Sequence, residues 1–258
     1  QNVAGRDDPA SDLPDNPLVP YLAVNADATG ASASIQGLVA GQTAQYVEGF
    51  GCTLGGEAPN LGEPTAVSAA NNPLATQTVT PTPELEAALD LAFGSDLSEA
   101  DRAALGTRGV VVVKDGQIVA ERYADGFTKD TPQLGWSMTK SVTSLLAGVL
   151  VNEGVVALDD ANLRPEWTDG RAEITLDDLM RMQSGLEWDE TYDLGTPITR
   201  MLYLESDMAK YVASLPLTHE PGTYQEYSSG STNLVCDVLV ERSGLGADLP
   251  RAKLFAPL

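Results

Sequence analysis

A serine and a lysine stand three residues apart, Ser137 and Lys140, at the beginning of an apolar run. A serine hydroxyl becomes a useful nucleophile when a base takes its proton. Residues three apart on a helix are neighbours, so Lys140 can reach the Ser137 hydroxyl if this segment is helical. Burial and the positive end of the helix dipole both favour the neutral amine that a base must be. The pair therefore offers a nucleophile and its base.

The residues after this pair predict the helix that would position it. Apolar side chains recur at three- and four-residue spacing, namely Val142, Leu145, Leu146, Val149 and Leu150. Gly154 supplies a stop signal at the far end. Because apolar residues occupy more than one side, we expect the helix to lie in a core. Its first amides would face an oxyanion formed on an attacked carbonyl.

A second segment, 221–234, leads from a Pro-Gly turn through Tyr227 and Ser229 into a further predicted helix. Together the two segments resemble the serine β-lactamase and penicillin-binding protein superfamily, nearest to the class C β-lactamase-like esterases and the 6-aminohexanoate-dimer (nylon-oligomer) hydrolases. The superfamily's first motif is Ser-x-x-Lys, matched by Ser137 and Lys140. Its second is Tyr-x-Asn or Tyr-x-Ser, matched by Tyr227 and Ser229. The resemblance covers about residues 110–258.

The resemblance implies catalytic roles for three residues. Ser137 would be the nucleophile that an ester or amide carbonyl acylates, and Lys140 and Tyr227 would share the acid and base roles. A tyrosine ordinarily titrates at a pKa of about 10, so Tyr227 needs the neighbouring Lys140 ammonium to act as a phenolate. The two titrations are then coupled, and neither residue alone can be named the base.

Two further residues become candidates for substrate binding. Ser229 stands where class C β-lactamases usually have Asn, which favours the esterase and oligomer-hydrolase branch. In the nylon-oligomer hydrolases a loop similar to 185–192 places an aromatic over the site, and Tyr192 is the matching residue here. Packing on the surface is the alternative for Tyr192 and for Trp188.

The implied fold class is α/β (α+β): a β-lactamase-like antiparallel sheet flanked by helices, with an all-helical subdomain at about 159–226. Residues 109–123 predict a hairpin, because two β-branched runs flank an Asp-Gly turn. The nearly continuous Val run predicts a strand covered on both faces. We expect an N-terminal arm and packing segment at 1–82 and the hydrolase domain at 83–258.

The superfamily's sheet needs three more strands, one of them with a Lys-Thr-Gly or His-x-Gly segment that lines the site. No such segment follows Asn233. We therefore expect the C-terminal strands to be missing from this chain. We also expect a C-terminal partner fragment to complete the fold.

The charge limits the possible partners. The chain has 37 acidic and 15 basic residues, a net charge of −22, which argues against nucleic acid and against anionic membranes. No apolar run approaches the roughly 20 residues that span a bilayer. The chain opens at Gln1 without a signal-like segment, as a mature periplasmic or secreted protein would.

No cofactor or metal is expected. The sequence lacks a phosphate-binding glycine loop, and its acidic pairs lack the spacing of an EF-hand; we interpret the pairs as solvated faces or helix N-terminal acids. Those pairs are Asp159-Asp160, Asp177-Asp178 and Asp189-Glu190. Cys52 and Cys236 lack the partners of a metal site, and we expect two buried thiols in preference to a disulfide.

The sequence thus predicts a metal-independent serine hydrolase that cleaves an ester or a small linear amide through an acyl-enzyme on Ser137. One alternative is a D-amino-acid peptidase or a β-lactamase. Another is a non-catalytic binding module of the same fold. A Ser-His-Asp triad would have to use His219, the single histidine, but the chain has no Gly-x-Ser-x-Gly elbow.

Overall fold

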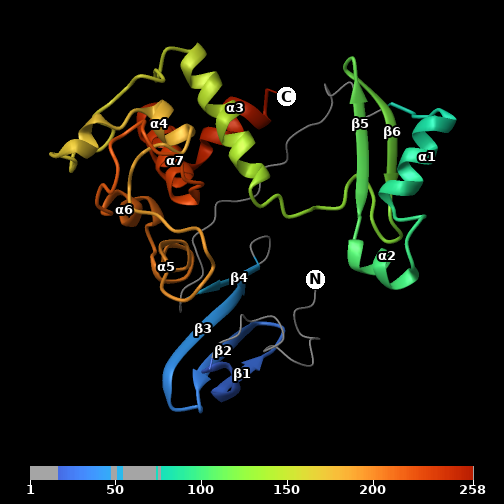
Figure 1. Cartoon of the computed structure of the whole chain (residues 1–258), viewed down its shortest axis with the longest axis horizontal. Coiled ribbons are helices and arrows are strands. Elements are labelled where there is room, and N and C mark those ends of the chain that lie inside the picture. Colours follow the sequence, from blue (N-terminus) through green and yellow to red (C-terminus); the bar gives the residue numbers. More distant parts are fainter. Residues whose placement is uncertain (1–16, 48–50, 55–73, 75–76, 258) are drawn as a thin grey trace. The chain divides into compact units, whose positions relative to one another are not determined.

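The computed structural model describes residues 17–47, 51–54, 74 and 77–257, without the side chains of residues 51 and 52 (Figure 1). Its contacts divide the chain into two units. One comprises Gln1–Thr65 and Leu158–Val238, and the other comprises Ala66–Ala157 and Leu239–Leu258. The domain limits expected from the sequence stay predictions, and much of the expected N-terminal arm lies outside the described residues.

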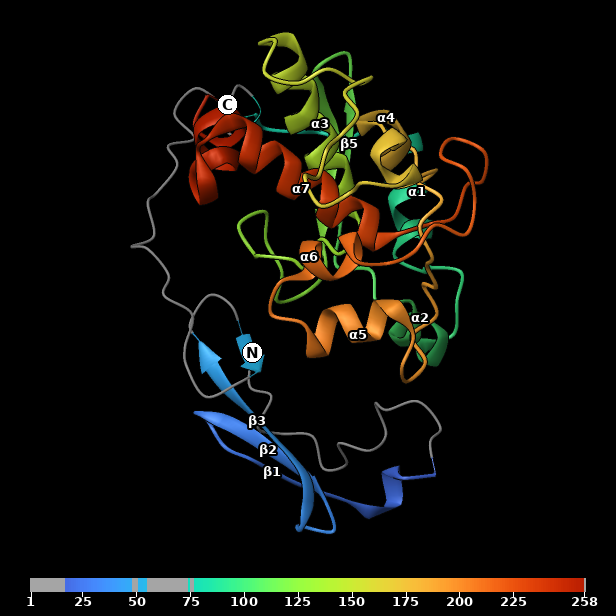
Figure 2. The same cartoon turned by 90° about the vertical axis from the view of Figure 1, so that its left-hand side faces the viewer.

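The first unit contains a four-stranded antiparallel sheet in which β1, β2 and β3 run alongside one another (Figure 2). The strands follow chain order and are β1 (Leu22–Ala26), β2 (Gly30–Ile35), β3 (Val39–Val47) and β4 (Gly51–Leu54). A 3-10 turn, Val19–Tyr21, precedes them. The register of β1 on β2 pairs Leu22 with Ile35 and Asn25 with Ser32, so apolar and polar side chains separate onto opposite faces. The predicted N-terminal packing segment therefore contains a sheet.

The rest of the first unit is helical and rich in loops. Its elements are a 3-10 turn at Gly170–Glu173, α4 (Leu176–Met180), α5 (Pro197–Leu204), α6 (Met208–Ala213) and most of α7 (Ser229–Ser243). Helix α4 begins with a capping box: the Thr175 hydroxyl accepts from the Asp178 amide at 3.0 Å, and the Asp178 carboxylate accepts from the Thr175 amide at 3.0 Å. The predicted role of the Asp177-Asp178 pair at a helix N-terminus is confirmed.

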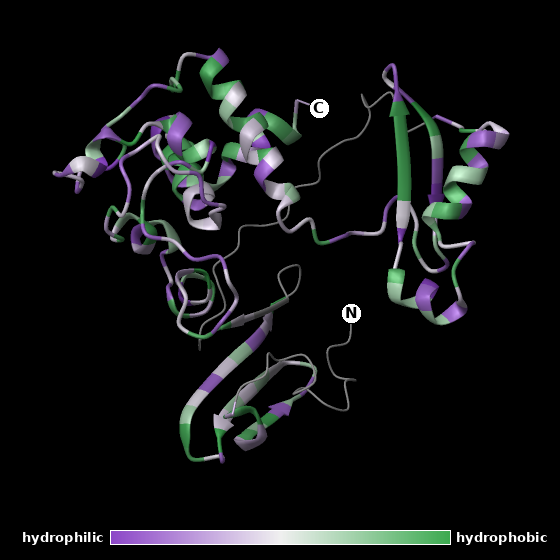
Figure 3. Ribbon diagram, viewed as in Figure 1, coloured by the Kyte–Doolittle hydropathy of each residue, from purple (hydrophilic) through white to green (hydrophobic). Residues whose placement is uncertain are grey.

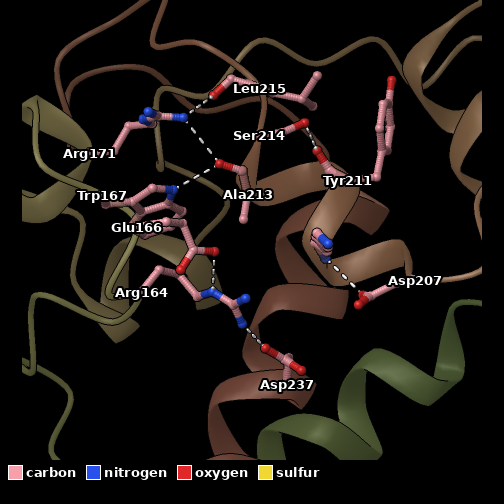
Figure 4. Close-up of polar contacts among 11 residues, drawn as sticks. Arg164, Glu166, Trp167, Arg171, Asp207, Tyr211, Ala213, Ser214, Leu215 and Asp237 are labelled. Carbon is pink, nitrogen blue, oxygen red and sulfur yellow. Dashed lines mark hydrogen bonds and ion pairs between the residues drawn. The ribbon is translucent and has the colours of Figure 1, made fainter.

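A polar network joins the loop before α4 to α6 and α7 (Figure 4). At the end of α6, the Ala213 carbonyl accepts from the Trp167 indole at 2.8 Å and from the Arg171 guanidinium at 3.1 Å. Arg164 forms ion pairs with Glu166, at 3.0 Å, and with Asp237 of α7. These bonds satisfy a helix-end carbonyl that has no partner within its own helix. The network reaches α7 at Asp237, in the middle of that helix.

The second unit contains α1 (Pro83–Ala92), α2 (Glu99–Leu105), β5 (Gly109–Lys114), β6 (Gln117–Tyr123) and α3 (Met138–Asn152), with short turns at Gly246–Asp248 and Arg251–Phe255. The predicted hairpin is confirmed as β5 and β6. Its turn residues Asp115 and Gly116 have φ of +52° and +74°, the left-handed conformation that two-residue hairpin turns favour. Arg122 of β6 forms ion pairs with Glu86 and, at 2.7 Å, with Asp90, which fixes α1 to the hairpin.

The expectation that this Val-rich strand is covered on both faces is wrong for the described chain. Strand β5 has four consecutive valines between Gly109 and Lys114 and is hydrophobic over most of its length (Figure 3). Even so, Val111 is 47% exposed and Val113 is 51% exposed. The physical reason is that β6 is the one strand paired with β5 among the described residues. A run of valines signals a buried strand, but burial depends on neighbours that the run itself does not supply.

Helix α3 confirms the prediction made from the residues after Ser137 and Lys140. It ends where expected, before Gly154 with φ of +71°. Leu146 and Leu150 are buried, but Leu145 is 62% exposed, so the expectation that several sides lie in a core is wrong for that residue. One side packs within its unit on the Arg251–Phe255 turn, where the Lys253 ammonium lies 2.8 Å from the Glu153 carboxylate.

None of the helices in the described part of the chain combines the length and apolar character that crossing a bilayer requires.

Candidate active site

The structure places Ser137 and Lys140 together at the start of α3. Ser137 immediately precedes the first residue of the helix, with exposed side chain. The Lys140 ammonium nitrogen Nζ lies 3.3 Å from the Ser137 Oγ and donates a hydrogen bond to it. The Lys140 side chain is half-buried.

The backbone before Ser137 is strained. Trp136 has φ of +44°, a conformation that is unfavourable for a bulky side chain. The strained residue is followed by a tight turn in which the amides of Met138, Thr139 and Lys140 donate to the carbonyls three residues earlier, at 2.9, 3.0 and 3.1 Å. Strain of this kind persists where the surroundings impose it and often marks a functional site. Because these three amides are already engaged, they do not supply the oxyanion donors that we expected from the helix start.

Tyr227 lies on a segment that two bonds to one residue hold in place. The Glu226 amide donates to the Met182 carbonyl at 3.0 Å, and the Ser228 amide donates to the Met182 sulfur at 3.4 Å. Met182 has φ of +58°, an unusual conformation for a residue without a turn-forming side chain. Between these two anchored amides the Tyr227 side chain is 48% exposed. The backbone is fixed, and the phenol is presented outward.

Ser229 begins α7, and its position is set by a carboxylate. Glu190 accepts from the Ser229 amide at 2.9 Å and from the Ser229 hydroxyl at 2.5 Å. The same carboxylate accepts from the Trp188 indole at 2.6 Å. The hydroxyl proton of Ser229 is therefore directed at Glu190, and the hydroxyl oxygen remains an acceptor for other groups.

Tyr192 lies near this carboxylate and near the phenol of Tyr227. Partial burial raises the pKa of Tyr192 above its usual range, and the neighbouring Glu190, Tyr227 and Tyr203 raise it further. At neutral pH Tyr192 is accordingly a hydrogen-bond donor and not a phenolate. Tyr192 and Tyr227 are each 48% exposed, and we call these two accessible side chains the aromatic patch of the first unit.

The loop under this patch is closely packed. A cavity of about 10 Å³ is bounded by Met182, Ser184, Leu186, Trp188, Tyr224 and Ser228, among others. This volume is enough for at most one water molecule. The cavity is therefore too small to hold a substrate.

The predicted site residues fall into two groups. Ser137 and Lys140 belong to the second unit, whereas Tyr192, Tyr227 and Ser229 belong to the first. Within each group the structure brings the predicted residues together. The structure describes the two groups separately, because they belong to different units.

Three residues that support the second group were missed from the sequence. Glu190 belongs to an acidic pair that we interpreted as a solvated face or as helix N-terminal acids; it is half-buried and accepts from the amide at the start of α7, but no sequence feature indicated that it holds Ser229. Trp188 was expected to pack on the surface, but it is 7% exposed, because its indole lies under the start of α7. Met182 gave no signal, since nothing in the sequence marks a left-handed methionine. The Gly230 that follows Ser229 was a usable sign that a large side chain approaches there.

His219, the single histidine, stacks on Tyr224 with ring centroids 4.1 Å apart and an interplanar angle of 14°. Its Nδ1 lies 3.1 Å from the Thr218 hydroxyl. Both contacts are with residues of the segment that connects α6 to α7.

Among the residues that the structure describes, no group of three or more His, Cys, Asp or Glu side chains is arranged to hold a metal ion. The Cys236 side chain is exposed, so the expectation of a buried thiol is wrong for this residue. The side chain of Cys52 lies outside the described residues.

The sequence model of the Beta-lactamase family matches residues 96–258 of this chain. The chain belongs to the beta-lactamase family. The match covers well over half of the chain and includes Ser137, Lys140, Tyr192, Tyr227 and Ser229. The resemblance inferred from the two motifs is thereby confirmed.

The fold is similar to that of solved structures. A protein of Bacteroides dorei DSM 17855, provisionally named a beta-lactamase, matches with a TM-score of 0.52 and 19% identity over 69% of this chain and 52% of its own. This likeness and the family match bear out the predicted α/β class, with antiparallel strands and several helices.

Two further structures match with lower TM-scores. A protein of Bacillus anthracis, provisionally named a 6-aminohexanoate-dimer hydrolase, has a TM-score of 0.47 and 23% identity over 57% of this chain and 44% of its own. The D-amino acid amidase of Ochrobactrum anthropi SV3 has a TM-score of 0.43 and 22% identity over 61% and 50%. The chain thus spans about half the length of these beta-lactamase-family structures. A search of curated proteins found no significant match.

Proposed function

We propose that this protein is a metal-independent serine hydrolase that cleaves an ester or a small linear amide through an acyl-enzyme on Ser137. The observation that carries the proposal is the 3.3 Å separation of Lys140 Nζ and Ser137 Oγ at the start of α3, in a chain of the beta-lactamase family. The strained Trp136 directly before the serine supports the same position.

In the proposed reaction, Ser137 Oγ bonds to the substrate carbonyl carbon while its proton passes to the coupled Lys140 and Tyr227 pair. The tetrahedral intermediate then collapses, the bond to the leaving amine or alcohol breaks, and that group takes the proton. Water attacks the resulting ester, which releases the acid and restores the serine. Because Tyr227 belongs to the other unit, the mechanism requires its phenol to reach this pair.

The substrate would lie against the exposed patch of Tyr192 and Tyr227, where the hydroxyl of Tyr192 can donate to a carbonyl. The Ser229 oxygen is a candidate acceptor for a substrate N–H, since its own proton is directed at Glu190. A small linear acyl chain suits an open aromatic surface better than it suits the closed cavity beneath. The motif resemblance to the esterases and nylon-oligomer hydrolases also supports such a substrate.

Hydrolysis of a p-nitrophenyl ester and of a p-nitroanilide of a linear acid tests the proposal, with Ser137→Ala and wild type treated with EDTA beside it. We expect release of nitrophenol or nitroaniline that is unchanged by EDTA and abolished by Ser137→Ala. Covalent capture of penicillin would instead favour the D-amino-acid peptidase or β-lactamase. Activity that survives in Ser137→Ala would overturn the assignment of the nucleophile. Inactivity of the wild type toward all of these would favour the binding module.

We further propose that a C-terminal partner fragment adds strands to β5 and β6. The support is the exposure of the Val-rich strand and the chain's match to about half of the solved relatives. Mass spectrometry of the protein purified from its native source should show a second polypeptide or a longer chain. A periplasmic or secreted location is part of the same proposal and is checked by fractionating those cells.

A further inference from the structure

We infer that Glu190 is a positioning residue for the reaction: it holds the start of α7, and through Ser229 it fixes the Tyr227 phenol in its reactive place. The inference rests on the proposed function, because it assigns the support of a residue that the proposed mechanism uses. It concerns a carboxylate that the motifs do not include.

The contacts of Glu190 show what it holds. One carboxylate oxygen accepts from the Trp188 indole at 2.6 Å and from the Ser229 amide at 2.9 Å, and the other accepts from the Ser229 hydroxyl at 2.5 Å. Hydrogen bonds to a charged acceptor are stronger than those between neutral groups. A carboxylate at the N-terminus of a helix is further stabilised by the helix dipole. Three bonds therefore converge on one half-buried side chain.

The packing of Trp188 adds a steric restraint at the next residue. A Cβ atom built on Gly230 would lie 2.5 Å from Cζ3 of the Trp188 ring, well inside van der Waals contact. The first turn of α7 therefore packs directly against the Trp188 indole. The Glu190 carboxylate fixes that indole by accepting from the indole N–H. Hydrogen bonding and packing hold the same turn.

Met182 restrains both neighbours of Tyr227, because it accepts from the amides of Glu226 and Ser228. Glu190 is a second anchor, one residue further along the chain at Ser229. Removal of the second anchor leaves the backbone after Tyr227 tied by Met182 and by the bond from the Ser231 amide to the Ser228 hydroxyl, at 2.9 Å. The Tyr227 side chain is 48% exposed, and the bonds on both sides of it fix the backbone from which the phenol projects.

Two substitutions of Glu190 distinguish a positioning role from a requirement for its negative charge. In Glu190→Gln the carboxamide oxygen can accept from the Trp188 indole and the Ser229 amide, while its NH₂ faces the Ser229 hydroxyl. A serine hydroxyl can rotate and accept instead of donate. All three bonds can therefore persist without the negative charge. In Glu190→Ala all three are lost.

The test measures the inactivation of the protein by a fluorophosphonate, separating the maximal rate of Ser137 modification from the concentration that gives half of it. Wild type, Glu190→Gln, Glu190→Ala and Glu187→Ala are compared; Glu187 is an exposed carboxylate on the same loop and serves as the matched control. We expect Glu190→Ala to lower the maximal rate by about 10- to 100-fold, as a displaced catalytic group does, with little change in the half-maximal concentration. Glu190→Gln should restore most of the rate, and Glu187→Ala should match wild type.

A maximal rate in Glu190→Ala equal to that of wild type would overturn the inference while leaving the proposed function intact. Equal losses in Glu190→Gln and Glu190→Ala would also overturn it, since they would assign the effect to the charge. An unreactive wild type would instead contradict the proposed function itself.

A second variant covers the case in which Glu190→Ala does not fold. Ser229→Ala removes one of the three bonds and keeps the bond from its backbone amide. We expect a smaller fall in the maximal rate, about 3- to 10-fold, with an unchanged half-maximal concentration. A raised half-maximal concentration with an unchanged rate would assign Ser229 to substrate contact and overturn its role as the link between Glu190 and Tyr227.

Discussion

The Nζ of Lys140 lies 3.3 Å from the Oγ of Ser137, and the two residues are separated by a single turn at the start of α3. Because the contact is local to one turn, it depends on the helix and not on distant segments. The sequence spacing alone was therefore enough to predict it.

Replacement of Lys140 by arginine tests whether this contact serves proton transfer. An arginine keeps the positive charge and the length but does not lose its proton in proteins. We expect Lys140→Arg to lower the turnover of an ester substrate by about 100- to 10,000-fold, similar to Lys140→Ala. The measurement uses a p-nitrophenyl ester. Activity of Lys140→Arg near that of wild type would show that a positive charge at this position is sufficient for catalysis and that proton transfer by Lys140 is not required.

Removal of the Tyr227 hydroxyl tests the second group of site residues. Tyr227→Phe keeps the ring, and the half-exposed side chain contributes little to the core, so the melting temperature should stay close to that of wild type. The rate of Ser137 acylation should fall by about 100- to 10,000-fold. Tyr203→Phe, an exposed tyrosine of the same unit, is the control. An unaltered acylation rate in Tyr227→Phe would remove Tyr227 from the mechanism.

The hairpin β5–β6 and the helix α3 were both predictable, because each is specified by short-range features: an Asp-Gly turn between β-branched runs, and a three- to four-residue apolar period that ends at Gly154. The exposure of Val111 and of Leu145 was not predictable from those features. A residue's type shows that it can be buried, but the partner surface that would bury it comes from elsewhere in the fold.

Gly230 should be intolerant of a side chain, because an added Cβ would collide with the Trp188 ring. We expect Gly230→Ala to lower the free energy of unfolding by about 1–3 kcal/mol, the usual cost of overpacking. The control is Gly148→Ala in α3, where nothing lies within 4 Å of the added atom. That change should stabilise the protein by about 0.5–1 kcal/mol, since alanine favours a helix. Urea unfolding measures both, and equal effects would contradict the packing at Gly230.

Tyr123 should link stability to pH at alkaline values. The hydrogen bond from its hydroxyl to the Glu121 carboxylate, 2.6 Å long, raises the pKa of Tyr123 to about 12, with burial and the Glu121 charge acting in the same direction. A raised pKa means that the folded state favours the neutral phenol. Its contribution is fully present below the unfolded pKa of about 10 and is lost as the pH rises through about 12.

The corresponding measurement compares the free energy of unfolding of wild type and Tyr123→Phe across this range. The difference should be constant from about pH 7 to about pH 9 and should shrink as the pH approaches 12. A difference that is equally large at both ends of the range would contradict the assigned bond.

The catalytic candidates were predictable where a motif carries them, as for Ser137, Lys140 and Tyr227. The residues that support these candidates were not predictable. Glu190 and Trp188 are distant from Ser229 in sequence, and their contact arises because the loop that bears them folds against the start of α7. The positive φ of Met182 and its two bonds to the segment of Tyr227 likewise could not be predicted from the residue type.

The most direct test of the central claim is the intact mass of the protein before and after exposure to a fluorophosphonate, with Ser137→Ala treated in parallel. We predict a single adduct on the wild type, located on Ser137 by peptide mapping, and none on the variant. An adduct of equal yield on Ser137→Ala, or an unmodified wild type whose fold is intact, would contradict the assignment of Ser137 as the nucleophile.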